Sequence, residues 1–194
     1  TKLNLRKHKR RTTMTKLEKQ SHDKLCEKLD LPSIPDFLLA SFDEVDNNYI
    51  DTSKGHTLQR GKFKSYYMHT KNSTSSKLRN WLKTTFDKHD IKIENPKGFI
   101  YQALIDGLKI HTDTGRNYVY NYIIDPGGSD VWTVFYNENK EEIYRVKIEP
   151  KTWYRLRTQT LHTVLGIEGV RFGVSVFDPR LDIRTGGLAQ QLRE

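Results

Sequence analysis

The chain has 194 residues, 35% of them apolar, and a formal net charge of +9 at neutral pH. This length suits one domain with a sizeable core, and the absence of an 18-residue apolar run and of a signal-peptide pattern argues against a membrane-spanning or secreted protein. The single cysteine, Cys26, excludes an internal disulfide, so we expect a cytoplasmic protein without membrane contacts.

The basic residues are concentrated in the N-terminal half. The first 30 residues carry ten Lys or Arg against four acidic residues, whereas residues 98–194 carry twelve of each. The densest run is L-N-L-R-K-H-K-R-R-T. It is either a solvated chain end or a cationic segment that binds nucleic acid or an acidic partner, and both interpretations stay open.

Two helices and a short strand are expected before residue 98. Thr15–Leu29 spaces its leucines and Cys26 along one helical stripe. Ser76–His89 has apolar residues at the same helical spacing and should pack on the outside of the core. Pro35–Asp46 is either a short helix or an ordered loop, and a strand is expected around Phe63–Met68.

From Gly98 onward the chain becomes a series of strand-like segments separated by turns. Val, Ile, Tyr, Phe and Trp dominate the segments, whereas Pro, Gly, Asn and Asp dominate the stretches between them. The segments are 98–107, 108–113, 118–124, 131–136, 142–148, 152–157, 161–165 and 170–177. Eight short strands indicate a closed or double-sheet barrel, in which alternate side chains fill the interior. We therefore expect a mostly β fold with flanking helices.

This pattern divides the chain into a tail and one domain. Residues 1–14 form the basic tail and residues 15–194 form the domain. Within the domain, residues 15–97 make a layer of helices and loops, and residues 98–178 make the β core.

Three side chains of the strand-rich half have metal-binding chemistry. His111 and Asp113 are two residues apart in I-H-T-D-T, so on a strand they point to the same face, and His162 follows in L-H-T-V-L. Two histidines and one carboxylate make a facial triad, which leaves three positions of a six-coordinate iron open. Taken singly, His162 could be a core histidine and Asp113 a turn-capping residue.

A family resemblance rests on these residues together with Arg171 in V-R-F-G-V-S-V-F. His-X-Asp, a distal His and a downstream Arg, in this order among strand-like segments, resemble the Fe(II)- and 2-oxoglutarate-dependent oxygenases. The resemblance covers less than half of the chain. It implies a double-stranded β-helix, or jelly roll, and a reaction that uses Fe(II), 2-oxoglutarate and O2, releases succinate and CO2, and usually hydroxylates its substrate.

The resemblance also implies a co-substrate site. Arg171, Gly173 and Ser175 share one strand face, and a planar guanidinium can donate two parallel hydrogen bonds to a carboxylate. By resemblance, Arg171 binds the distal carboxylate of 2-oxoglutarate with the help of a hydroxyl. The candidates for that hydroxyl are Ser175, Tyr101, Tyr118 and Tyr120. Each tyrosine could equally be an aromatic core residue.

We expect a hairpin to set the spacing of this site. If Glu168 and Gly169 form a two-residue turn, His162 pairs with Ser175, and Arg171 lies about 13 Å farther along the strands. Gly173 would then leave empty space for a five-carbon diacid.

The prime substrate is less determined by the sequence. The D-T-G-R-N and W-Y-R-L-R-T runs look like small bacterial and phage oxygenases related to prolyl and aspartyl/asparaginyl hydroxylases, which favours a protein or amino-acid substrate. Four side chains were expected at the pocket mouth: Arg116, Trp153, Arg155 and Arg157. Arg116 could equally form a surface salt bridge.

Two other functions remain possible at this level. One is a non-catalytic jelly-roll binding module, in which the triad residues are packing residues. The other is a nucleic-acid-binding protein that uses the basic half and whose affinity falls steeply with salt. Base repair is disfavoured, because Phe177 occupies the position of the second Arg that base-demethylating oxygenases place six residues after the first.

Overall fold

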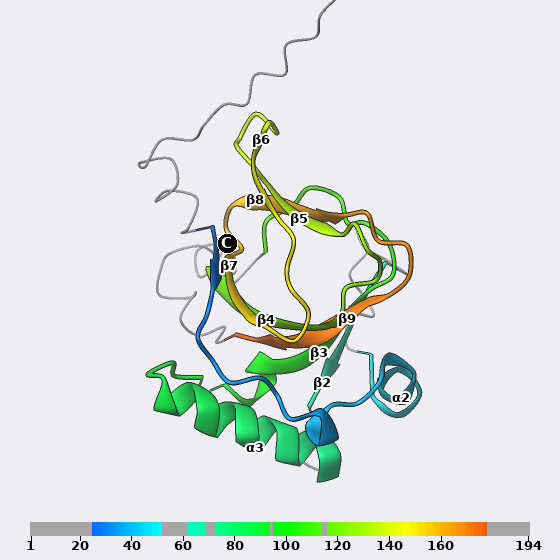
Figure 1. Cartoon of the computed structure of the whole chain (residues 1–194), viewed down its shortest axis with the longest axis vertical. Helices are drawn as coiled ribbons and strands as arrows, with labels where there is room; N and C mark the ends of the chain where they lie inside the picture. The colour runs from blue at the N-terminus through cyan, green and yellow to red at the C-terminus, as the bar shows by residue number, and fades with distance from the viewer. Residues whose placement is uncertain (1–24, 52–61, 69–72, 94, 114–115, 178–194) are drawn as a thin grey trace, which may run out of the picture.

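The computed structural model describes residues 25–51, 62–68, 73–93, 95–113 and 116–177. The described residues form mostly β structure, with two antiparallel sheets that face each other (Figure 1). The six-stranded sheet has the order β1-β7-β4-β9-β3-β2, and the three-stranded sheet has the order β6-β5-β8. The strands are β1 (Cys26–Lys28), β2 (Phe63–Tyr67), β3 (Phe99–Leu104), β4 (Tyr118–Asp125), β5 (Trp132–Tyr136), β6 (Glu142–Val146), β7 (Trp153–Arg157), β8 (Leu161–Leu165) and β9 (Arg171–Val176).

A helical layer covers the outer face of the six-stranded sheet (Figure 1). Its elements are η1 (Asp36–Leu38), α2 (Phe42–Asn48), α3 (Ser73–Lys88) and η3 (Pro96–Gly98). In α3, Leu78, Leu82 and Phe86 recur every four residues and are fully buried. The helix expected over Ser76–His89 is therefore confirmed, with a start three residues earlier.

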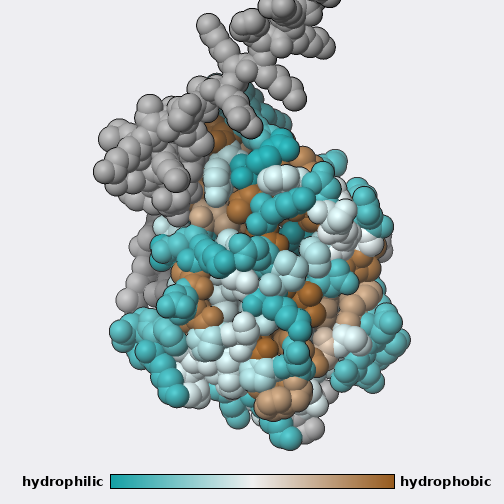
Figure 2. Space-filling model, viewed as in Figure 1, coloured by the Kyte–Doolittle hydropathy of each residue, from teal (hydrophilic) through white to brown (hydrophobic). Residues whose placement is uncertain are grey.

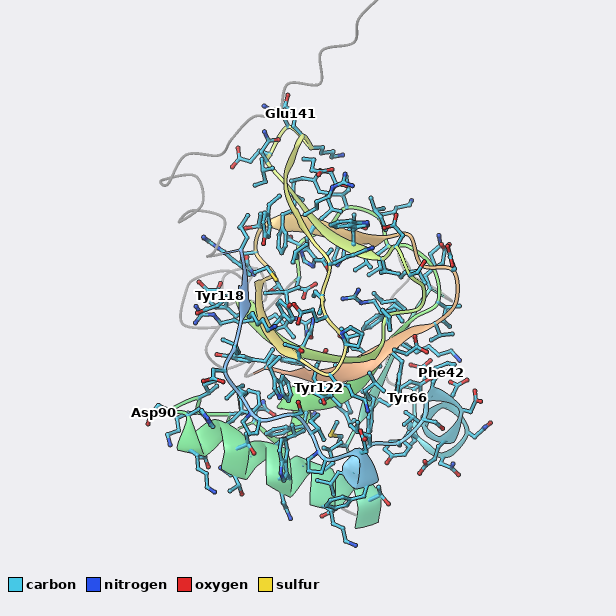
Figure 3. The ribbon with its side chains drawn as sticks, viewed as in Figure 1. Phe42, Tyr66, Asp90, Tyr118, Tyr122 and Glu141 are labelled. Carbon is cyan, nitrogen blue, oxygen red and sulfur yellow. The ribbon has the colours of Figure 1, made fainter. Side chains whose placement is uncertain are left out.

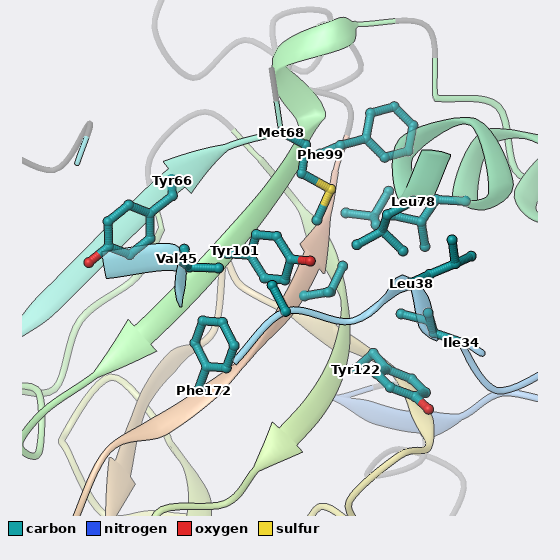
Figure 4. Close-up of a cluster of buried hydrophobic side chains, with 14 of the residues drawn as sticks. Ile34, Leu38, Val45, Tyr66, Met68, Leu78, Phe99, Tyr101, Tyr122 and Phe172 are labelled. Carbon is teal, nitrogen blue, oxygen red and sulfur yellow. The ribbon is translucent and has the colours of Figure 1, made fainter. Parts of the chain in front are cut away.

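The main apolar core lies between this layer and the sheet. Tyr101, Tyr122 and Phe172 project from neighbouring strands toward the helical layer, where Leu78 meets them (Figure 4). Tyr101 stacks on Phe172 with ring centroids 5.4 Å apart. Apolar side chains thus cover this face of the sheet.

The opposite face of the six-stranded sheet looks toward the three-stranded sheet. Val119, Ile123 and Leu156 form a second apolar cluster with Phe135 of β5. Along β9, the outward residues of the main core alternate with Arg171, Gly173 and Ser175, which therefore face the space between the sheets.

The prediction of a helix over Thr15–Leu29 is wrong for the residues of this range that the structure describes. Cys26–Lys28 is a strand that pairs with β7, with Cys26 opposite Leu156, while residues 15–24 lie outside the described part. Leu25 and Cys26 are buried in the second cluster. Pairing with a sheet edge overrides the helical spacing, because a short helix has little stability of its own.

The strand expected over residues 108–113 is reduced to one isolated bridge between His111 and His162. The hairpin at Glu168–Gly169 is also wrong. Strand β8 pairs with β5, whereas β9 pairs with β3 and β4, so the two strands belong to opposite sheets. The backbone N–H groups of Glu168 and Gly169 both donate to the Gly127 carbonyl, which ties the connection to another turn.

Gly173 has a different role from the one expected. A Cβ added there would lie 2.5 Å from the Tyr122 carbonyl oxygen and 3.0 Å from Cα of Ile123, both on the neighbouring strand β4. Glycine is needed for this close approach of the strands, so a larger residue would disturb the sheet before it blocked a ligand.

The surface has the mixed character of a folded domain. On the face in Figure 2, apolar residues are interspersed among hydrophilic ones. Within the described residues, none of the helices combines the length and the apolar character needed to cross a membrane. The division into tail and domain stays a prediction, and the basic tail lies outside the described residues.

Candidate metal centre

Backbone hydrogen bonds bring His111, Asp113 and His162 together. His111 and His162 exchange both N–H···O bonds, at 3.1 and 2.8 Å, and the N–H of Asp113 donates to the Thr158 carbonyl at 2.9 Å. One ligand atom from each of the three lies within 4.8 Å of the others. Oδ1 of Asp113 is 3.4 Å from Nε2 of His111 and 3.9 Å from Nε2 of His162. The three side chains thus converge as a metal-binding set.

The two histidines are held in the same tautomer. Nδ1 of His111 lies 2.8 Å from the Lys109 carbonyl, and Nδ1 of His162 lies 2.8 Å from the Thr160 carbonyl. A carbonyl oxygen only accepts, so each Nδ1 carries a hydrogen, and in the neutral ring each Nε2 keeps its lone pair. These lone pairs belong to the nitrogens that face Asp113, which is the arrangement of metal-binding histidines.

Burial and charge set the protonation of the triad. Burial alone would raise the pKa of Asp113, but the interactions with His111, Arg116 and His162 outweigh it, and the pKa lies well below the usual value. Burial lowers the pKa of His162. For His111, burial also acts downward, but the interaction with Asp113 prevails and raises the pKa. At neutral pH, Asp113 is therefore ionised and His162 is neutral.

Arg116 binds Asp113, which differs from its expected place at the pocket mouth. Its Nε donates to Oδ2 of Asp113 at 2.7 Å, and its Nη2 lies 2.7 Å from the same oxygen. Its guanidinium carbon lies 4.5 Å from the centroid of the Phe177 ring. The alternative of a salt bridge is closer to the structure, although this one is partly buried next to the triad.

Arg171 is a buried cation between the sheets. Its residue is 4% exposed, and Nη2 reaches Oγ1 of Thr133 only at 3.5 Å. Nη1 is buried and has no hydrogen-bond partner among the described residues. Burial lowers the pKa of Arg171 to about 10. A buried guanidinium with open donors can bind an anion.

The register of the three-stranded sheet gives the spacing from triad to Arg171. His162 is opposite Phe135, and Val164 is opposite Thr133, which contacts Arg171. One two-residue step of about 7 Å therefore separates the level of His162 from that of Thr133. This replaces the longer spacing derived from the wrong hairpin, and it suits a five-carbon diacid between a metal and the guanidinium.

Ser175 has two amide neighbours that the sequence reasoning missed. Its Oγ is 2.5 Å from Oε1 of Gln102 and 2.6 Å from Oδ1 of Asn121. A hydroxyl has one hydrogen, so one of the amides must turn its NH2 toward Ser175. The three side chains form a polar cluster on the inner face of β3, β9 and β4. No sequence motif marks them, and only the strand alternation with Ser175 would have suggested them.

The three tyrosines expected near the co-substrate point the other way. Tyr101 is buried in the main core, and Tyr120 packs edge-on against Phe86 of α3. Tyr118 follows the same alternation and lies outside the barrel, on the same side of β4 as Tyr122 (Figure 3). Their expected role is therefore wrong, and their alternative role in packing holds for Tyr101 and Tyr120.

The three β7 residues expected at the pocket mouth also face outward. Trp153 is fully buried against Phe86 and donates from Nε1 to the Pro32 carbonyl. Arg155 pairs with Glu27 at 2.6 Å. Arg157 is exposed and shares the face of Trp153 and Arg155 by strand alternation. Because Tyr154 and Leu156 take the inward positions, the three side chains point away from the space between the sheets, and their expected substrate contacts have no support from the structure.

Comparison with known proteins adds a likeness of fold. The sequence matches no protein-family model and no curated protein. Among solved structures, it is similar to a prolyl hydroxylase from Trichoplax adhaerens in complex with a hypoxia inducible factor oxygen degradation domain peptide fragment, with TM-score 0.52 and 14% identity over 87% of this chain and 90% of that one. It is also similar to a 2OG-Fe(II) oxygenase family oxidoreductase from Burkholderia pseudomallei, with TM-score 0.52 and 9% identity over 82% and 86% of the two chains. At these identities the likeness concerns the fold.

Proposed function

We propose that the chain is an Fe(II)- and 2-oxoglutarate-dependent oxygenase with a double-stranded β-helix core. The observation that carries the proposal is the pairing of a convergent His-Asp-His set with a buried, unsatisfied Arg171 about one two-residue step away along the barrel. A metal site alone fits many functions. A metal site with an anion site at this spacing fits a chelating diacid.

The strand order supports the jelly roll. Of the eight strand-like segments from residue 98 onward, the first, third, sixth and eighth lie in the six-stranded sheet. The fourth, fifth and seventh lie in the other sheet, and the second joins it through the His111–His162 bridge. The chain thus passes repeatedly between two facing sheets, as in a double-sheet jelly roll, with β1 and β2 as extra edge strands.

The donor set fits ferrous iron. Two imidazole nitrogens and one carboxylate are the ligands of the facial triad, and the hydrogen bonds at both Nδ1 atoms orient the rings for it. His111, Asp113 and His162 would hold the metal. When bound, iron with 2-oxoglutarate and O2 would supply the oxidation of a C–H bond, with succinate and CO2 as co-products.

The remaining inward side chains would bind and orient the co-substrate. Arg171 would donate to the distal carboxylate, with the Thr133 hydroxyl next to it. Ser175, with Asn121 and Gln102, would line the six-stranded side of the same space. Phe135, fully buried beside His162, would exclude water from the metal side.

For the prime substrate we propose a side chain of a protein or a free amino acid, and hydroxylation as the reaction. The support is the fold likeness to the prolyl hydroxylase in complex with a peptide fragment, together with the sequence resemblance. The nucleic-acid alternative rests on the basic N-terminal half, whose densest run lies outside the described residues. Neither of the two similar structures is described as a nucleic-acid-binding protein, so the alternative gains no support from them.

A succinate assay tests the proposal. The full chain is incubated with Fe(II), 2-oxoglutarate and O2, and with a panel of proline-, asparagine- and aspartate-containing peptides, free amino acids and oligonucleotides. Succinate and oxidised substrate are quantified by NMR and mass spectrometry. We expect succinate that depends on Asp113 and Arg171 and that increases with a peptide or an amino acid. Succinate no higher than in Asp113→Ala, with every substrate, would favour the non-catalytic binding module.

A further inference from the structure

We infer that Arg116 is a positioning residue that makes Asp113 a single-oxygen metal ligand. The inference rests on the proposed metal site. It concerns a residue for which the sequence predicted a contact with the substrate. Both nitrogens of the Arg116 fork that contact Asp113 reach the same atom, Oδ2, each at 2.7 Å. The other oxygen, Oδ1, is the one directed at the two histidines.

Arg116 is itself fixed from three directions. Its guanidinium lies over the Phe177 ring, and Phe177 is held by a backbone hydrogen bond to the Gly98 carbonyl. The backbone carbonyl oxygen of Arg116 accepts from Oγ1 of Thr158 at 2.9 Å and from Nε2 of Gln159 at 2.7 Å. The stack and these bonds leave the fork little freedom, so it acts as a rigid donor toward Asp113.

The same turn also holds the ligand. Gln159 Nε2 donates to the Asp113 carbonyl at 3.0 Å, and the Thr158 carbonyl accepts from the Asp113 N–H at 2.9 Å. The turn at residues 158–159 therefore clamps the backbone of both Asp113 and Arg116. It fixes the position of the carboxylate relative to His162, because strand β8, which carries His162, begins at Leu161, two residues after Gln159.

The consequence is that Asp113 offers a fixed number of oxygen atoms to the metal. A carboxylate can bind a metal through one or both oxygens, and binding through both would occupy a position that a facial triad leaves open. With Oδ2 engaged by Arg116, only Oδ1 is offered. The guanidinium charge opposes a second cation, but it is already balanced by the ionised Asp113, and outer partners of metal ligands ordinarily strengthen binding by ordering the ligand.

The test compares Arg116→Gln and Arg116→Lys with Arg155→Gln in the full chain. Arg155 is a matched control, because it too pairs with a carboxylate, Glu27, and lies over a ring, Tyr118, but on the outer face. Co(II) is used as the probe, since its visible absorption reports coordination number, and its affinity is measured by titration. Thermal melting without metal monitors the fold.

We expect Arg116→Gln to weaken Co(II) binding about tenfold and to change the visible spectrum, because the second oxygen of Asp113 would take a position otherwise left to water. Arg116→Lys keeps the charge but loses the fork, so it should recover part of the affinity and retain the altered spectrum. Arg155→Gln should match the wild type. If Arg116→Gln fails to fold, Phe177→Leu, which removes only the stack, should move the spectrum in the same direction.

The outcomes separate this inference from the proposed function. Wild-type affinity and spectrum in Arg116→Gln and Arg116→Lys, with the fold retained, would overturn the inference while leaving the metal site intact. If Arg116→Gln does not fold, an unchanged spectrum in Phe177→Leu overturns it as well. Failure of the wild-type chain to bind Co(II) would instead remove the metal site, and this inference with it.

Discussion

Replacing Arg171 by Met should stabilise the ligand-free protein and weaken its stabilisation by 2-oxoglutarate. Methionine has a similar length and keeps the apolar stem of the side chain, but it removes a charge that is 4% exposed and lacks a partner at Nη1. Replacing a buried charge by an apolar residue of similar volume is commonly neutral or stabilising by about 1–4 kcal/mol.

The size of the effect follows from the pKa of Arg171. Burial lowers this pKa from 12.5 to about 10, and a lowered pKa of a base means that its charged form is disfavoured in the folded state. The penalty is fully present below pH 10, and it amounts to roughly 3 kcal/mol at about 1.4 kcal/mol per pKa unit. For a chain of this length, such a gain should raise the melting temperature by about 6–12 °C.

The ligand should narrow the difference in stability between the two proteins. A diacid at about one hundred times its Kd adds roughly 2.7 kcal/mol to the stability of the wild type. Loss of the charge-assisted bonds lowers the affinity of Arg171→Met at least about tenfold, so the same concentration should add no more than roughly 1.4 kcal/mol to the variant. Urea unfolding with Mn(II), with and without 2-oxoglutarate, measures both effects. An Arg171→Met protein that is less stable than the wild type without ligand would refute the reasoning, because the guanidinium would then be satisfied within the fold.

The remaining predictions concern the triad, strand β9 and the outer layer. His111→Ala and His162→Ala should each raise the Kd for Mn(II) at least about a hundredfold by titration while the metal-free melting temperature changes little; retained affinity in both would place the metal elsewhere. Gly173→Ala should cost about 1–3 kcal/mol in urea unfolding, because its Cβ would meet the Tyr122 carbonyl, and wild-type stability would mean that β9 can move away from β4. Hydrogen bonds from Lys64 and Tyr66 hold the pKa of Asp46 below its usual value, so its contribution to stability is present above the ordinary carboxyl pKa and is lost as the pH falls through the lowered value. Asp46→Asn should therefore flatten the fall in melting temperature below about pH 4. An unchanged fall in the variant would count against the interactions of Asp46 with Lys64 and Tyr66.

Elements defined by local spacing could be predicted from the sequence, and elements defined by distant pairing could not. Helix α3 was predictable because Leu78, Leu82 and Phe86 carry their period within a few turns. Strand β1 was not, because Cys26 is extended only through its pairing with Leu156, far along the chain. The hairpin error has the same origin, since the turn after β8 looks local but connects two sheets.

The candidate site shows the same division. The triad was predictable from residue types, order and spacing. The inward or outward direction of Tyr101 and Trp153 was not, because strand alternation tells which residues share a face but not which face looks into the barrel, and a choice of the wrong face inverts every side chain. The contact of Arg116 with Asp113 depends on a turn at residues 158–159 that no spacing in the sequence reveals.

A crystal structure of the full chain, grown without oxygen in the presence of Fe(II) and 2-oxoglutarate, tests the central claim most directly. We predict the metal between Nε2 of His111, Nε2 of His162 and Oδ1 of Asp113, with one carboxylate of the diacid on Arg171 and its other end on the metal. A metal bound elsewhere, or a diacid outside the space between the two sheets with Arg171 still unpartnered, would contradict the account.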